Sequence, residues 1–437
     1  MPFAEDFLHY IWKFRLFRQQ GLITTTGLPV EITHPGLHNL NAGPDFENSR
    51  IRIGDTNWAG NIEIHLRSSD WERHSHQTDP AYNNVILHVV FVCDKEVYRE
   101  NGTAIPQLCL ENLIPETVAG NYERLILGVN WIPCEKQIGG VDEFHVRNWL
   151  SRVLIERLEQ KSENLKEVLA EYKGSWDDAF YIIMARNFGF KTNTLPFEQL
   201  ARSLPQQILS KHKNNTLQIE ALVFGQAGFL GGKFADAYPQ QLKKEYQFLK
   251  SKYSLQAVDH FTWKYMRLRP QNFPCIRLAQ FAALILKSNH LFSQILEVKN
   301  VALISKMFSD LSVNPYWETH YRFDVISEKT TKQIGNQSIN NIMINTVAVS
   351  LFAYGRHIGQ QSFINRAIGL LENTPAETNK VVNRFHEIGL RPQNADQTQA
   401  LMQLKQAYCD AKKCLHCGIG IKLLKTVNDV SEDTYLF

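Results

Sequence analysis

The stretch from Val85 to Cys93, VILHVVFVC, constrains the fold of this chain more than any other feature. Apolar and β-branched residues occupy both of its faces, whereas a strand with one solvent-exposed face alternates apolar and polar positions. The stretch therefore predicts a strand buried inside a sheet. The 437 residues, 44% apolar and 21% charged, provide enough core for two or three domains.

The segments around this strand predict a defined order of elements. Apolar residues at helical spacing predict a helix over 4–19, and alternating patterns predict strands over 30–33, 45–54 and 61–67. A short helical or looped segment is expected over 71–82, just before the buried strand. From about residue 143 the patterns become helical and strands become hard to find.

The predicted fold class is therefore α+β. An N-terminal α/β core in the order helix, three strands, helix, strand precedes a mainly α-helical domain. We expect an α/β domain at 1–140, a helical domain with C-terminal cysteines at 141–426, and a flexible tail at 427–437.

Two acidic residues mark the second and third predicted strands. Asp45 opens the second strand, and Glu63 lies within the third, two positions before His65. Residues i and i+2 of a strand share a face, so Glu63 and His65 point the same way, away from Ile64. Two carboxylates beside a basic group suit a divalent cation, although the polar side of a half-buried strand has the same pattern.

Pro44-Asp45 and Glu63-Ile64-His65, in this order of elements, resemble the motif of the PD-(D/E)XK nuclease superfamily over about the first 95 residues. The resemblance implies that Asp45 and Glu63 bind Mg²⁺ or Mn²⁺ together with the Ile64 carbonyl. It implies cleavage of DNA or RNA phosphodiester bonds, with His65 as the third catalytic group in the position usually held by lysine. The whole chain also resembles a bacterial family known only as a domain of unknown function.

His65 departs from the superfamily's usual lysine. An unperturbed imidazole has a pKa of about 6.5 and is mostly neutral at pH 7. A catalytically inactive nuclease-like scaffold that binds nucleic acid or a protein partner is therefore the alternative function.

A histidine cluster follows the motif. Four of the 15 histidines lie between His65 and His88, the others being His74 and His76, and Asp79 is close by. Imidazole and carboxylate are ligands for Zn, Mn or Fe, so these residues are candidates for an independent metal site or for support of Glu63. A hydrogen-bonded core histidine equally explains His88, because an unpaired imidazole in a buried strand is costly.

Three cysteines near the end of the chain, Cys409, Cys414 and Cys417, have the spacing C-x4-C-x2-C. Such a group suits a thiophilic metal, and Cys134 is the best candidate for a fourth ligand. Some nucleases of the superfamily hold an iron–sulfur cluster with a similar arrangement. Zinc, an iron–sulfur cluster and free buried thiols all remain open.

Three arginines, Arg267, Arg269 and Arg277, surround two prolines in the predicted helical domain. Such residues bind phosphates, and they also cap helices or fill interfaces. The formal net charge of +3 does not by itself indicate nucleic-acid binding, so a nucleic-acid partner requires a local basic groove.

The sequence favours a cytoplasmic protein with no membrane association. Its first residues lack the basic-then-apolar order of a signal peptide, and no apolar run approaches the roughly 20 residues of a membrane-spanning helix. An odd count of seven cysteines argues against a disulfide framework. Which protein partners the chain has is unknown from the sequence.

Overall fold

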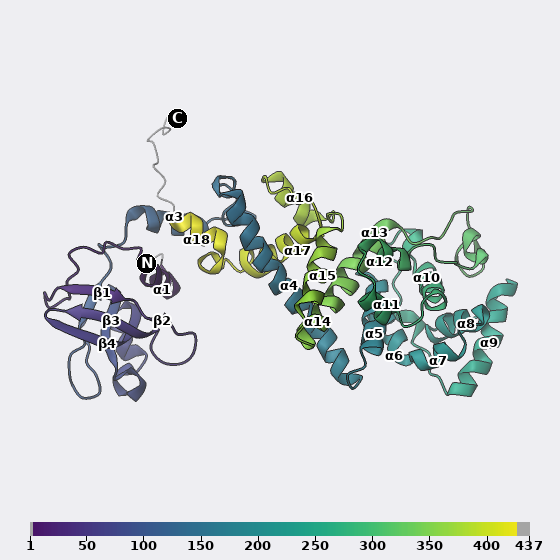
Figure 1. Cartoon of the computed structure of the whole chain (residues 1–437), viewed down its shortest axis with the longest axis horizontal. Helices are drawn as coiled ribbons and strands as arrows, with labels where there is room; N and C mark the ends of the chain where they lie inside the picture. The colour runs from purple at the N-terminus through teal and green to yellow at the C-terminus, as the bar shows by residue number, and fades with distance from the viewer. Residues whose placement is uncertain (1–2, 426–437) are drawn as a thin grey trace. The chain divides into compact units, whose positions relative to one another are not determined.

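The computed structural model describes residues 3–425, and the tail predicted at 427–437 lies outside the described residues. Contacts divide the chain into two units. The first comprises residues up to 149, 388–390 and 404 onward, and the second comprises 150–387 and 391–403. The α+β class is confirmed, with the large sheet in the first unit and most helices in the second (Figure 1).

The residues from 404 onward group with the N-terminal unit, whereas the sequence predicts them in the helical domain. The reason is the packing of α18 (Gly418–Lys425) against α3 (Glu116–Ile126). The Asn121 side chain donates a hydrogen bond to the Leu423 carbonyl at 3.3 Å. Periodicity in the sequence reports local structure, so it does not predict a contact between segments that are so far apart along the chain.

The first unit is built on a six-stranded sheet in the order β1-β3-β4-β5-β6, with β2 beside β3. The strands are β1 (Val30–His34), β2 (Leu37–His38), β3 (Phe46–Ile53), β4 (Thr56–Arg67), β5 (Val85–Val92) and β6 (Gln107–Cys109). Strand β4 pairs antiparallel with β3 and parallel with β5. The predicted buried strand is confirmed, because the first six residues of β5 are buried.

Both faces of β4 are buried at its centre. Ile62 and Ile64 on one face are inaccessible, and on the other face Glu63 and His65 are only 4% and 1% exposed. The polar face is therefore not a solvent-facing side of the strand. Gly60 permits the approach of the β4 and β5 backbones, since a Cβ there would lie 2.4 Å from Ile86 Cγ2.

Helix α1 (Glu5–Phe14) packs against β4. It ends earlier than the predicted 4–19, because Arg15 adopts a left-handed conformation with φ 51°. The segment between β4 and β5 contains only the short α2 (Asp70–Arg73) and two 3₁₀ turns, His76–Thr78 and Pro80–Tyr82. The functional side chains described below come from α1, the start of β3, β4 and this segment.

The second unit is mainly helical, and the boundary between the units falls within α4. Its helices are α4 (Glu143–Glu171), α5 (Trp176–Phe188), α6 (Thr194–Ser203), α7 (Gln206–Lys211), α8 (Thr216–Gln226), α9 (Ala237–Tyr253), α10 (Pro274–Lys287), α11 (Leu291–Glu297), α12 (Val301–Phe308), α13 (Asn336–Ile342), α14 (Ala348–His357), α15 (Gln361–Glu372), α16 (Lys380–Glu387) and α17 (Ala395–Gln403).

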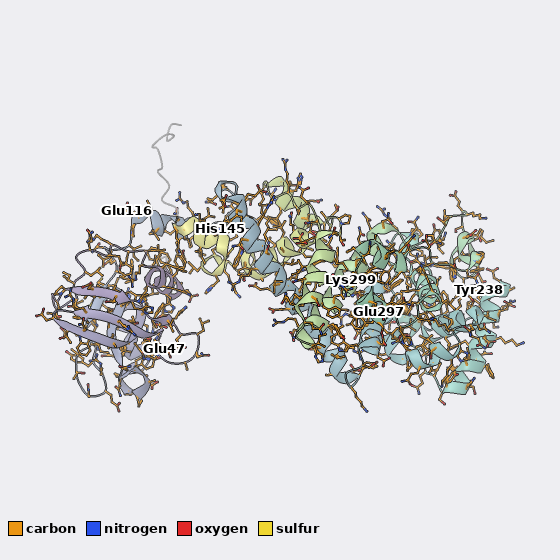
Figure 2. All side chains as sticks on the ribbon, viewed as in Figure 1. Glu47, Glu116, His145, Tyr238, Glu297 and Lys299 are labelled. Atoms are coloured by element: carbon orange, nitrogen blue, oxygen red, sulfur yellow. The ribbon has the colours of Figure 1, made fainter. Side chains whose placement is uncertain are left out.

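One short hairpin, β7 (His320–Arg322) and β8 (Val325–Ile326), interrupts the helices of the second unit. Aromatic side chains pack on one another near this hairpin: the ring centroids of Tyr238, labelled in Figure 2, and Tyr316 lie 4.7 Å apart. No helix among residues 3–425 is long and apolar enough to cross a membrane.

Candidate metal centre

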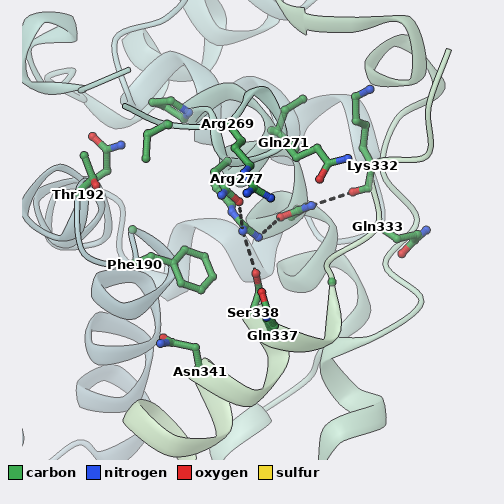
Figure 3. Close-up of a pocket in the computed structure, with 18 of the residues that line it drawn as sticks. Phe190, Thr192, Arg269, Gln271, Arg277, Lys332, Gln333, Gln337, Ser338 and Asn341 are labelled. Carbon is green, nitrogen blue, oxygen red and sulfur yellow. Dashed lines mark hydrogen bonds between the residues drawn. The ribbon is translucent and has the colours of Figure 1, made fainter. Parts of the chain in front are cut away.

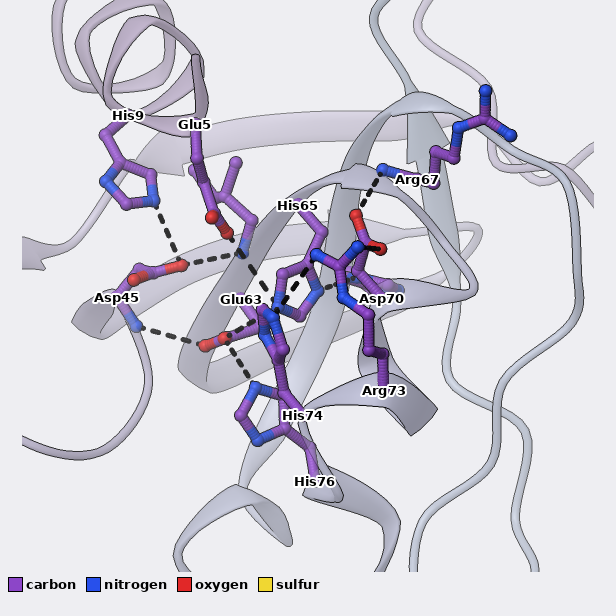
Figure 4. Close-up of polar contacts among 12 residues, drawn as sticks. Glu5, His9, Asp45, Glu63, His65, Arg67, Asp70, Arg73, His74 and His76 are labelled. Atoms are coloured by element: carbon purple, nitrogen blue, oxygen red, sulfur yellow. Dashed lines mark hydrogen bonds and ion pairs between the residues drawn. The ribbon is translucent and has the colours of Figure 1, made fainter.

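The main chain holds the two predicted acidic side chains side by side. The Asp45 amide donates a hydrogen bond to Glu63 Oε2 at 3.2 Å, and the Ile64 amide donates one to Asp45 Oδ2 at 2.9 Å (Figure 4). These reciprocal bonds link the residue before β3 to the centre of β4. The structure thus brings Asp45 and Glu63 together, and the contact from Ile64 is made by its amide.

Helix α1 adds two ligand side chains that the sequence analysis missed. His9 Nε2 lies 3.2 Å from Asp45 Oδ2, and Glu5 Oε1 lies 3.8 Å from His65 Nε2. Ligand atoms of Glu5, His9 and Asp45 all lie within 4.8 Å of one another, as a metal site requires. The one available sequence signal was the i, i+4 spacing of Glu5 and His9, which places them on one helix face.

A second ligand group surrounds Glu63. Its Oε1 lies 3.2 Å from His76 Nε2 and 3.4 Å from His65 Nε2. Ligand atoms of His65, His74 and His76 lie within 4.8 Å of one another, and His65 Nε2 is 3.1 Å from His74 Nδ1 (Figure 4). The predicted histidine cluster therefore converges on the acidic pair.

The structure places the other two predicted members of the histidine cluster outside both ligand groups. His88 lies on β5 behind His65, with its Nε2 2.9 Å from His65 Nδ1. Asp79 is exposed and accepts the Ala81 amide at 2.9 Å, so it caps the 3₁₀ turn that follows. We therefore assign His88 to positioning His65, and Asp79 to the local backbone.

Burial sets the protonation of the centre. Desolvation, followed by the negative charge of Asp45, raises the pKa of Glu63 to about 9. Desolvation, followed by the neighbouring imidazoles, lowers the pKa of His65 to about 2, and burial lowers that of His88 to about 3. His65 and His88 are thus neutral at pH 7, and a cation would take the place of the Glu63 proton. His9 differs, because its contact with Asp45 outweighs burial and raises its pKa.

A permanent cation lies at the edge of this centre. The Arg73 guanidinium, 69% exposed in its side chain, contacts Asp70 Oδ1 at 3.1 Å and His74 Nε2 at 3.4 Å. Its position on α2 gave no sequence signal beyond its proximity to the histidines. Arg73 thus places a positive charge beside His74, partly balanced by the Asp70 carboxylate.

The four predicted thiols all belong to the first unit and lie close enough to interact electrostatically. None forms a disulfide, and three are no more than 8% exposed: Cys134, Cys414 and Cys417, with Cys409 partly exposed. Burial, followed by the charges of Cys417 and Cys414, raises the pKa of Cys134 to about 12. The two segments also touch through the Lys405 ammonium, which lies 5.1 Å from the Trp131 ring centroid.

The three predicted substrate-binding arginines lie in the second unit. Arg269 and Arg277 line a cavity there (Figure 3), whereas Arg267 is exposed and does not line it. Two of the three arginines therefore line the same cavity, and the third lies outside it.

Comparison with known proteins identifies one family. The family model described as "Protein of unknown function (DUF2851)" matches residues 5–380, which include both ligand groups around Asp45 and Glu63. No curated protein and no solved structure matches the chain.

Proposed function

We propose that this chain, a member of the DUF2851 family, is a metal-dependent hydrolase that cleaves phosphodiester bonds in nucleic acid. The main support is the arrangement of side chains that could bind metal. Two groups of them lie beside Asp45 and Glu63, which are linked by main-chain hydrogen bonds. The sequence resemblance of Pro44-Asp45 and Glu63-Ile64-His65 to the PD-(D/E)XK motif favours the same reaction. The DUF2851 description itself assigns no activity.

The ligand atoms suit divalent cations. Glu5, His9 and Asp45 would hold one ion, and His65, His74 and His76, with Glu63 beside them, would hold another. The oxygen-rich first group suits Mg²⁺ or Mn²⁺, whereas the imidazole-rich second group suits Mn²⁺, Zn²⁺ or Fe²⁺. A bound cation supplies a Lewis acid that activates water and offsets charge on the phosphate.

The protein groups have separate roles in this proposal. The low pKa of His65 keeps its imidazole neutral, so it serves as a ligand and not as a substitute for a charged lysine. Arg73 supplies the permanent positive charge that would contact the substrate phosphate. Asp45 and Glu63 fix the separation of the two ligand groups through their main-chain hydrogen bonds.

We also propose that the four cysteines hold a structural zinc ion or an iron–sulfur cluster. The four thiols come from two distant segments, lie close enough to interact electrostatically, and form no disulfide. Burial raises the pKa values of Cys134, Cys409 and Cys414, which keeps these thiols protonated in the metal-free protein, and a metal would stabilise the thiolates.

Cleavage assays test the proposed activity. The full chain is incubated with single- and double-stranded DNA and RNA, with Mg²⁺, Mn²⁺ or EDTA, alongside Asp45→Asn and Glu63→Gln. Glu47→Gln is the matched control, because Glu47 is an exposed carboxylate on β3 (Figure 2). We expect metal-dependent cleavage that falls about a hundredfold or more in the two site variants and is unchanged in the control.

Two outcomes would contradict the proposal. Cleavage that persists in both Asp45→Asn and Glu63→Gln would locate the activity elsewhere. Metal-dependent binding of nucleic acid without cleavage by the wild-type protein would instead support the inactive scaffold.

A further inference from the structure

The second unit contains a cavity of about 510 Å³, within the usual range of small-molecule sites (Figure 3). Its wall is formed by the first turn of α10, part of α13, and loops around 189–193, 268–272 and 331–335. The wall carries three basic residues, Arg269, Arg277 and Lys332. No aspartate or glutamate is among the described residues that line it.

Arg277 is the unusual residue of this wall, since it is only 7% exposed. Its guanidinium donates to Gln280 Oε1 at 2.9 Å, to Asn272 Oδ1 at 2.6 Å and to Ser338 Oγ at 2.8 Å (Figure 3). All three acceptors are neutral. The buried Nε has no hydrogen-bond partner, and no ion pair among residues 3–425 includes Arg277.

A buried guanidinium without a counter-charge is costly. Burial alone lowers the pKa of Arg277 to about 10, with no carboxylate acting in the opposite direction. The Phe190 ring, 4.2 Å from the guanidinium carbon, compensates the charge only in part. Arg277 also lies in the first turn of α10, whose helix dipole adds positive potential. The cavity is therefore suited to an anion.

Neutral hydrogen-bonding groups cover another part of the wall. The side-chain amides of Gln271, Gln337 and Asn341 line the cavity (Figure 3) and have no hydrogen-bond partner among the described residues. Lys332 contributes differently, because its ammonium lies against the Tyr321 ring and its carbonyl accepts a hydrogen bond from Gln280. Amide side chains pair well with the edges of heterocyclic bases, which both donate and accept hydrogen bonds.

We propose that this cavity binds a small phosphate monoester with a nucleoside-like body. The phosphate would lie against Arg277 and Arg269, and the heterocycle against the amides of Gln271, Gln337 and Asn341. The inference is independent of the metal centre, because it rests only on residues of the second unit.

Isothermal titration of the full chain with AMP, UMP, inorganic phosphate, adenosine and citrate tests this site. EDTA is present throughout, so that cation-dependent binding at the metal centre is suppressed. The variants are Arg277→Gln and Arg269→Gln, with Arg391→Gln as a matched control at an exposed arginine outside the cavity. Arg269 is exposed and makes no side-chain hydrogen bond among the described residues, so Arg269→Gln should not affect folding. This variant can therefore still test the site if Arg277→Gln unfolds.

We expect at least one nucleotide to bind, with inorganic phosphate and adenosine each binding at least about tenfold more weakly. Arg277→Gln and Arg269→Gln should weaken nucleotide binding about tenfold to a hundredfold, and Arg391→Gln should not change it. The proposal is overturned if no nucleotide binds, or if both cavity variants bind as the wild type does. Citrate binding as tight as that of the nucleotides would overturn the assignment to phosphate.

Discussion

The imidazoles of His65 and His88 lie 2.9 Å apart in the interior, from Nδ1 of the first to Nε2 of the second. Both side chains are neutral, because burial lowers their pKa values to about 2 and 3. One proton must therefore lie between the two rings. If His65 Nδ1 carries it and His88 accepts it, the lone pair of His65 Nε2 is free to bind a cation beside Glu63.

This arrangement predicts that His88 controls metal affinity without touching the metal. His88→Phe removes the acceptor for the His65 Nδ1 proton, and we expect divalent-cation affinity to fall about tenfold to a hundredfold. Titration calorimetry with Mn²⁺ measures the change. His386→Phe, at an exposed histidine on α16, is the matched control. Equal affinities of wild type and His88→Phe would show that this hydrogen bond does not position a metal ligand.

The raised pKa of Glu63 predicts that metal binding releases a proton. The pKa is about 9 in the metal-free protein, so Glu63 is protonated at pH 7 and must ionise to face a cation. Affinity should rise with pH, by up to about tenfold per unit, and level off near pH 9. His65 and His88 add no further dependence in this range, because burial keeps their pKa values at about 2 and 3.

Calorimetry in buffers of different ionisation enthalpy counts the released proton. Glu63→Gln should bind cations more weakly and with a flatter pH profile between pH 6.5 and 9. A wild-type affinity that does not change over this range would contradict the assigned role of Glu63.

Arg73 should affect turnover and not metal binding. Its side chain contacts His74 yet is 69% exposed, so a substrate phosphate can reach it. We expect Arg73→Gln to lower kcat about tenfold to a hundredfold, with Arg73→Lys recovering part of the loss. Arg52→Gln, at an exposed arginine paired with Glu31, is the control. A decrease in Mn²⁺ affinity as large as the decrease in kcat would assign Arg73 to the structure of the metal site.

The cysteine cluster should retain a metal through purification. Elemental analysis and an absorption spectrum of anaerobically purified protein distinguish zinc from an iron–sulfur cluster. Cys414→Ser should lose the metal and unfold at a lower temperature, whereas Cys109→Ser, at a cysteine on β6, should retain it. Wild-type protein with less than about 0.1 equivalent of zinc or iron would exclude this site.

The sequence predicted those features that leave a local pattern. The apolar run of β5 predicts its burial directly. The alternation around Ile64 predicts which side chains share a face, although both faces of β4 are buried there. Asp45 and Glu63 adjoin as predicted, because the pairing of neighbouring strands brings them together.

The remaining features depend on tertiary contacts and capping. Glu5 and His9 join the centre only because α1 packs on the polar side of β4. Asp79 is outside it because its carboxylate caps the following turn, and the sequence does not show which amide a carboxylate will bind. The proposed roles of His65 and Arg73 likewise depend on how far each side chain is buried. Burial lowers the pKa of His65, whereas the Arg73 side chain is exposed.

Anomalous scattering at the manganese edge, from crystals of the full chain soaked in Mn²⁺, tests the metal centre most directly. We expect a peak about 2.0–2.6 Å from the ligand atoms of Glu63 and the His65, His74 and His76 group. A second peak should lie near Glu5, His9 and Asp45, and the first should be lost in His65→Ala crystals. Density that shows these side chains ordered, with no peak among them in protein that cleaves nucleic acid, would contradict the proposed centre.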